Sequence, residues 1–85
     1  MKHFTEPDFW KCYHTLPGAI QRLADKNFAI LKADPTHPSL QFKKVGRLRS
    51  ARVGSHYRAL AVEKGGDLVW FWIGSHAEYG RIIDR

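Results

Sequence analysis

The sequence YRALAVEKGGDLVWFWI, which covers residues 57–73, decides the fold of this chain. Tyr57–Val62 has the composition of a β-strand, and Lys64–Asp67, with its two glycines, is typical of the tight turn of a β-hairpin. Leu68–Ile73 is apolar at every position, which indicates an internal strand whose two faces are both covered. A β-hairpin is therefore predicted near the centre of the molecule.

Weaker strand signals lie on either side of this hairpin. Leu40–Val45 alternates imperfectly between apolar and polar residues, and Ser50–Val53 is a short strand candidate. Gly54–His56 is typical of a turn, and Lys2–Thr5 could add an edge strand. We expect three or four antiparallel strands.

Two helices are predicted before these strands. Apolar residues on one face of the first helix are Phe9, Cys12, Tyr13 and Leu16. Thr5 can cap its start, and Pro17 followed by glycine breaks it. Thr15 can cap the second helix, whose apolar stripe covers residues 20–31, and Pro35 ends it because the residue before a proline is disfavoured in a helix. The short link predicts an antiparallel helical hairpin.

These elements predict an α+β fold in one domain, residues 1–85, because a chain of 85 residues is too short for a second core. The helical hairpin is expected to pack on one face of a small three- to four-stranded antiparallel sheet. The other face is then left for solvent or a ligand. His76–Asp84 could form a short terminal helix or an irregular segment.

The composition excludes several classes of protein. Hydrophobic residues make up 44% and aromatic residues 13%, which excludes wholesale disorder. The single cysteine excludes an intrachain disulfide, and Cys12 with His14 supplies too few ligands for a metal site. The chain has no apolar run long enough to span a membrane and no apolar stretch typical of a signal peptide at its start. A cytoplasmic protein without a metal is expected.

Positive charge is concentrated in one part of the chain. The formal net charge is +6, and no acidic residue occurs between Pro35 and Val62. That segment carries Lys43, Lys44, Arg47, Arg49, Arg52 and Arg58, together with His37 and His56. An unbroken basic segment indicates a polyanionic partner, either nucleic acid or an acidic protein, although a cationic surface can also serve solubility alone.

The chain resembles the RelE/ParE superfamily of toxins from type II toxin–antitoxin systems, in particular its RelE- and HigB-like members. The residues that carry the resemblance are Phe42–Val45, Ser50–Gly54, His56–Leu60 and Trp72–Tyr79, with Phe9, Leu16–Pro17 and Ile20–Gln21 before them. RelE-like members cut messenger RNA in the ribosomal A site without a metal and leave a 2′,3′-cyclic phosphate. ParE-like members share the fold but inhibit DNA gyrase, and both kinds are neutralised by an antitoxin that wraps the toxin.

The resemblance implies a toxin that acts as a ribosome-dependent, metal-independent mRNA endonuclease with no cofactor. Its partners would be a cognate antitoxin, mRNA and the ribosome, and the free toxin is expected to be monomeric. Two alternatives stay open: a ParE-like inhibitor of gyrase, and a degenerate toxin that only binds its antitoxin. The family commonly has an aromatic residue where Arg49 stands and an acid where Gly80 stands, so this chain departs from the pattern at both positions.

Metal-free RNA cleavage needs proton transfer at two oxygens and stabilisation of charge on the phosphate. Arginine suits the last task, and Arg58 and Arg52 occupy basic positions of the motif, so both are predicted to hold phosphate. The alternative is that they cap strand ends or pair with Glu63 and Glu78.

The remaining candidates are a proton carrier, a tyrosine and several binding residues. His76 matches a basic position of the family and can transfer a proton near neutral pH, and Tyr79 matches the family's late tyrosine, which stacks on a base or relays a proton. Either ring could instead pack over the sheet. The predicted RNA- or ribosome-binding residues are Lys43, Lys44, Arg47, Arg49 and His56, and only one of the two adjacent lysines can face the RNA. Trp70 and Trp72 are expected to point to one face, either to stack bases or to fill the core.

Overall fold

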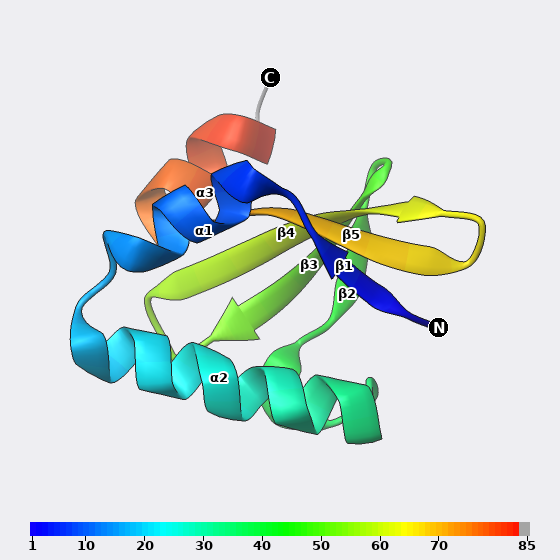
Figure 1. Ribbon diagram of the computed structural model, residues 1–85, viewed down its shortest axis with the longest axis horizontal. Coiled ribbons are helices and arrows are strands. Elements are labelled where there is room, and N and C mark those ends of the chain that lie inside the picture. Colours follow the sequence, from blue (N-terminus) through cyan, green and yellow to red (C-terminus); the bar gives the residue numbers. More distant parts are fainter. Residues whose placement is uncertain (84–85) are drawn as a thin grey trace.

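The computed structural model describes residues 1–83 and shows a five-stranded sheet with two helices across one face (Figure 1). Along the chain the elements are β1 (His3–Thr5), α1 (Pro7–His14), α2 (Gly18–Ala33), the 3-10 turn η1 (Pro38–Leu40), β2 (Lys43–Val45), β3 (Leu48–Val53), β4 (Tyr57–Lys64), β5 (Asp67–Ser75) and α3 (His76–Ile83). The predicted terminal helix is present as far as Ile83, and Asp84 lies outside the described residues. No helix within residues 1–83 is long and apolar enough to cross a membrane.

The hairpin of β4 and β5 forms as the sequence predicts. Lys64 pairs with Asp67, so Gly65 and Gly66 alone make the turn. Both have positive φ angles, 59° and 85°, which is the backbone of the two-residue turn that suits twisted strands. The hairpin provides two of the three inner strands of the sheet, whose order is β1-β5-β4-β3-β2.

The prediction of a three- to four-stranded antiparallel sheet is wrong in strand number and in one direction. β1 forms at the suggested N-terminal edge, but it pairs parallel to β5, with His3 opposite Leu68 and Thr5 opposite Trp70. The other neighbouring strands are antiparallel, so the sheet is mixed. Alternation within a strand reports which residues share a face. It does not report the direction of a partner strand far along the chain.

The main core lies between the helices and one face of the sheet. α1 packs chiefly on β5, and α2 packs on β3. The small side chains of Ala51 and Ala59 stand opposite each other under the helices, and Leu31 from α2 packs in the same cluster with Trp70 and Ile73 from β5. The helices therefore bury one sheet face through small residues on β3 and β4 and large ones on β5.

The helices differ from the predicted antiparallel hairpin because each lies mainly on its own strand. Neither predicted cap forms: Thr5 belongs to β1 and accepts a hydrogen bond from Trp10, and the Thr15 hydroxyl donates to the carbonyl of Cys12. α2 starts after Pro17 without a side-chain cap. Its end at Ala33, two residues before Pro35, agrees with the prediction.

Candidate active site

The sheet face opposite the main core carries the predicted phosphate-holding residues. Ala51 and Ala59 point into the core, so strand alternation turns Arg52 and Arg58 to the other side, and these two arginines are directly opposite each other on β3 and β4. We define the arginine face as the side of the sheet that carries Ser50, Arg52, Arg58, Leu60, Trp72 and Gly74. Arg58 shares this face with Leu60, and Arg52 shares it with Ser50, as the alternation of side chains along a strand predicts from the sequence.

Arg58 is a buried cation with little to neutralise it. Its residue is 9% exposed, and its Nη2 donates a hydrogen bond of 3.1 Å to Oε1 of Gln41. Its Nη1 is buried and has no hydrogen-bond partner. Within residues 1–83 no carboxylate lies in ion-pair distance of this guanidinium. Burying a charge and a donor without partners costs free energy, and an anion bound next to this guanidinium would reduce that cost.

The acids that could have paired with the arginines are engaged elsewhere. Glu63 forms an ion pair of 3.1 Å with Arg49, on the helix-facing side of the sheet. Glu78 accepts hydrogen bonds from Ser75. For Arg58 the structural alternative of pairing with either acid therefore does not hold in this structure.

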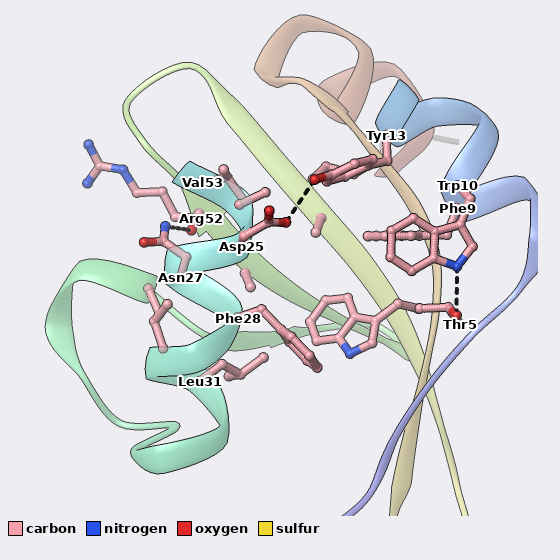
Figure 2. Close-up of a pocket in the computed structure, with 16 residues that line it drawn as sticks. Thr5, Phe9, Trp10, Tyr13, Asp25, Asn27, Phe28, Leu31, Arg52 and Val53 are labelled. Atoms are coloured by element: carbon pink, nitrogen blue, oxygen red, sulfur yellow. Dashed lines mark hydrogen bonds between the residues drawn. The ribbon is translucent and has the colours of Figure 1, made fainter. Parts of the chain in front are cut away.

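Arg52 is partly committed to the backbone. Its Nε donates to the carbonyl of Gly54 at 2.8 Å, which supports the turn between β3 and β4. Its guanidinium extends away from the residues of α1 and α2, as Figure 2 shows. The bond to Gly54 agrees with the alternative in which Arg52 caps a strand end. Because this bond uses only Nε, it does not occupy the two Nη groups.

A capping box places α3 directly after β5. Ser75 Oγ accepts from the backbone N–H of Glu78 at 3.2 Å, and Glu78 Oε1 in turn accepts from the N–H of Ser75 at 3.3 Å. These reciprocal bonds satisfy free donors of the first helical turn. The backbone N–H of His76 donates to the carbonyl of His56 at 2.7 Å, which joins α3 to the turn before β4.

His76 and Tyr79 lie together at the start of α3. Their ring centroids are 5.6 Å apart, and the Tyr79 ring centroid is 5.4 Å from Cζ of Arg58. His76 is exposed to solvent, whereas Tyr79 is only 4% exposed. Tyr79 therefore packs against Arg58, and His76 is the group of this pair that solvent or a ligand reaches.

The other predicted binding residues divide between the two faces. Lys43 stands opposite Ser50 and so shares the arginine face, whereas Lys44 stands opposite Arg49 on the helix-facing side. Arg47 is exposed in the turn between β2 and β3, and His56 is exposed next to the start of β4. The structure thus brings Arg52, Arg58, His56, His76, Tyr79 and Lys43 to one side of the sheet and separates Lys44 and Arg49 from them.

The two tryptophans of β5 do not point to one face, so that prediction is wrong. A register shift between Leu60 and Ala61 pairs Trp70 with Ala61 and Trp72 with Leu60. Because neighbouring residues of β4 point to opposite sides, Trp70 enters the core and Trp72 joins the arginine face. Simple alternation along β5 does not reveal this bulge.

Gln41 is a site residue that the sequence analysis missed. It adopts a left-handed backbone with φ of 43° after η1, and its side chain is the acceptor for Arg58. No local pattern marks a glutamine in an irregular segment as the partner of a strand arginine.

An apolar cavity of about 110 Å³ lies on the other side of the sheet, between α1, α2 and the core strands (Figure 2). Phe9, Phe28 and Trp70 are among the residues that line it. Asp25 lines it too and accepts a hydrogen bond of 2.8 Å from Tyr13. Burial raises the pKa of the Tyr13 phenol, and that hydrogen bond adds to the effect. This cavity has no unsatisfied buried polar side chain, so the chemical candidates remain on the arginine face.

Several solved structures have an architecture similar to that of this chain. No protein-family model and no curated protein sequence matches the chain. The RelB–RelE antitoxin–toxin complex from Methanococcus jannaschii aligns with a TM-score of 0.73 at 16% identity, over 93% of this chain and 96% of that one. YafQ from Escherichia coli gives a TM-score of 0.73 at 12% identity, over 92% and 96%. The YoeB/ParE toxin from Agrobacterium tumefaciens gives 0.66 at 14% identity, over 89% and 99%.

The chain has the fold of the RelE/ParE-type toxins.

Both departures from the RelE/ParE pattern are compatible with this fold. Arg49 forms its ion pair with Glu63 across β3 and β4. A side chain added at Gly80 in α3 would meet no atom within 4 Å, so the glycine is not required by packing. Within residues 1–83 no group of three or more His, Cys, Asp or Glu residues could hold a metal ion.

Proposed function

We propose that this protein is the toxin of a toxin–antitoxin pair and that it cleaves mRNA on the ribosome without a metal. The observation that carries the proposal is Arg58, a guanidinium nine-tenths buried on the arginine face with an unsatisfied Nη1 and no carboxylate partner among the described residues. Such a group is suited to a phosphate that carries growing negative charge.

The neighbouring groups fit the remaining steps. In the reaction the 2′-hydroxyl oxygen attacks the adjacent phosphorus, the bond to the 5′-oxygen breaks, and the products are a 2′,3′-cyclic phosphate and a 5′-hydroxyl. One proton leaves the 2′-oxygen and one reaches the 5′-oxygen. His76 is exposed beside Tyr79 and can carry one of these protons, while Tyr79 packs against Arg58 and holds it in place.

An antitoxin is the proposed protein partner. Two of the structures with this fold, from Methanococcus jannaschii and Pyrococcus horikoshii, are RelE–RelB complexes. With a net charge of +6 and an arginine face that lacks acidic partners for Arg58, the chain is suited to an acidic segment of such a protein.

Inducible expression followed by mapping of new mRNA 5′ ends tests the proposal. The parent chain should produce cuts within reading frames, and Arg58→Lys should lose them because lysine keeps the charge but not the planar fork. Arg22→Lys is the matched control, since Arg22 is exposed on α2, an element of the opposite face. Thermal unfolding of each purified variant separates loss of chemistry from loss of folding.

Three results would contradict the proposal. Growth arrest with intact transcripts and DNA damage would favour a gyrase inhibitor. No arrest at all would favour a chain that only binds its antitoxin. Cuts that persist in Arg58→Lys would remove Arg58 from the site.

A further inference from the structure

Trp72 lies outside the main apolar core under the helices. It stands opposite Leu60 on the arginine face and is only partly buried. It does not pack against the apolar cluster under the helices. By contrast, Trp70 is 4% exposed within that cluster, and its Nε1 donates to Nδ1 of His3 at 3.1 Å. Within residues 1–83 the Trp72 indole makes neither a hydrogen bond nor an aromatic contact of this kind.

The indole of Trp72 extends toward the candidate site. A Cβ built on Gly74 would lie 2.5 Å from Cζ2 of Trp72 and 3.1 Å from both Cε2 and Cη2. The six-membered ring therefore fills the space that a side chain at residue 74 would need. Gly74 is the register partner of Arg58, so the ring lies along β5 over the residue that pairs with Arg58.

The tyrosine that the family resemblance offers for base stacking is not open to a base in this structure. Tyr79 is 4% exposed and its ring is close to both His76 and Arg58. Trp72 is the aromatic residue that the strand register places in the row next to Arg58. Lys43 extends the row of Ser50, Leu60 and Trp72 across the sheet and can contact the same strand of nucleic acid.

We propose that Trp72 stacks on a nucleobase of the single-stranded mRNA whose phosphate is held by Arg58. This inference rests on the proposed function and adds the class of group that the site recognises beside the phosphate. An aromatic ring stacks on any base, because every base has a π-face, and the loss of one such contact weakens binding about tenfold or more. Gly74 takes part indirectly, since only a residue without a side chain lets the indole keep its place.

Binding to programmed ribosomes tests the stacking contact. The mRNA carries a 2′-O-methyl group at each nucleotide of the A-site codon to block cleavage, and a second set of mRNAs replaces one base of that codon at a time by an abasic nucleotide. Trp72→Leu should bind the intact codon about tenfold more weakly than the parent, and Trp72→Phe should fall between them. At one of the three positions, the abasic nucleotide should weaken binding of the parent by the same factor of about ten. The affinity of Trp72→Leu should not change at that position, because its stacking contact is already lost.

Two more variants sharpen the result. Gly74→Ala should weaken binding to the intact codon by displacing the indole, and it should have no added effect in the Trp72→Leu background. Trp10→Leu removes an exposed tryptophan from α1, which packs on the opposite face, and should bind as the parent does. Thermal unfolding shows which variants are folded. If Trp72→Leu does not fold, Trp72→Phe still tests the stacking contact.

Equal binding of Trp72→Leu and the parent to the intact codon would overturn the inference. The inference would also be overturned if Trp72→Leu bound more weakly than the parent by the same factor at all three abasic positions, because Trp72 would then stack on none of the three bases. A loss of antitoxin binding with unchanged ribosome binding would make Trp72 a protein contact. The proposed function is tested separately, by measuring whether the parent protein cleaves unmodified mRNA. Cleavage there with no effect of Trp72 leaves the nuclease in place and removes only the stacking contact.

Discussion

At the scale of single residues, Arg58 is a buried charge that is expected to lower the stability of the fold. Its guanidinium is taken out of water and receives one acceptor, Oε1 of Gln41, while Nη1 has none. Replacing a buried charge of this kind by an apolar residue of similar volume is often neutral or stabilising. This arrangement is consistent with the proposed role of Arg58 in binding an anionic ligand.

The free energy of unfolding of Arg58→Met is expected to equal that of the parent or to exceed it by up to a few kcal/mol. The variant should also lose mRNA cleavage. Urea denaturation and cleavage on programmed ribosomes measure the two effects. A loss of several kcal/mol of stability would show that Arg58 is needed for folding.

His76 carries the prediction about proton transfer. His76→Gln keeps a hydrogen-bonding side chain but cannot carry a proton near neutral pH, so single-turnover cleavage should fall by about 10²-fold or more. Ribosome binding should change little, and the pH–rate profile should lose one limb. Parental cleavage with an unchanged profile would transfer the role to Tyr79 or His56.

His3 carries a prediction about acid stability. Burial lowers the pKa of its imidazole, Lys32 and the N-terminal ammonium lower it further, and Asp67 opposes them. The unfolded chain therefore takes up this proton first as the pH falls below the ordinary value of 6.5, and the folded state loses stability down to the lowered pKa. Protonated Nδ1 also cannot accept the hydrogen bond from Trp70.

Replacement of this histidine should flatten the acid side of the stability profile. His3→Gln keeps an acceptor but does not titrate, so its melting temperature should fall less between pH 7.5 and pH 5.5 than that of the parent. Parallel pH profiles in the two proteins would remove His3 as a source of acid sensitivity.

At the scale of elements, the junction of β5 and α3 assembles the site. β5 carries Trp72 and Gly74, and the capping box of Ser75 and Glu78 starts α3 within the next residue. The first turns of α3 then place His76 beside the turn before β4 and Tyr79 against Arg58. A local helix signal thus controls the position of two predicted catalytic side chains.

The capping box gives a prediction about α3. Ser75→Ala removes the acceptor for the Glu78 N–H and should reduce the free energy of unfolding by about 1 kcal/mol. Amide hydrogen exchange should quicken in α3 more than in β4. Ser55→Ala changes an exposed serine in a turn and is the matched control. Equal exchange in the two variants would contradict the role of the cap.

At the scale of the whole molecule, the mixed sheet separates two surfaces. The helices bury one face, and the arginine face opposite them carries Lys43, Arg52 and Arg58 together with α3. Because the chain carries a net charge of +6, electrostatic attraction to a polyanion is expected to contribute much of the proposed affinity for the ribosome.

Salt dependence tests this distribution of charge. Ribosome affinity should fall steeply between 50 and 200 mM salt, and each lost phosphate contact should reduce the slope of log K against log salt by about 0.7. Lys43→Ser should show that reduction because Lys43 shares the arginine face, whereas Lys44→Ser should keep the parental slope. Equal slopes for the two variants would contradict the assignment of faces.

The amino-acid sequence alone determined the features that depend on neighbouring residues. Backbone preferences act over a few positions, so Gly65 and Gly66 predicted the central hairpin and Pro35 predicted the end of α2. The two-residue period of a strand was enough to place Arg58 with Leu60 on one face.

Tertiary structure decided the features that join distant segments. The parallel pairing of β1, the bulge that separates Trp70 from Trp72, and the contact of Gln41 with Arg58 each depend on packing between parts of the chain that are remote in sequence. Arg58 illustrates the difference. Its face followed from alternation, but its burial and unsatisfied Nη1 arise only when η1, β4 and α3 meet, because low polarity around a charge is produced by many residues together.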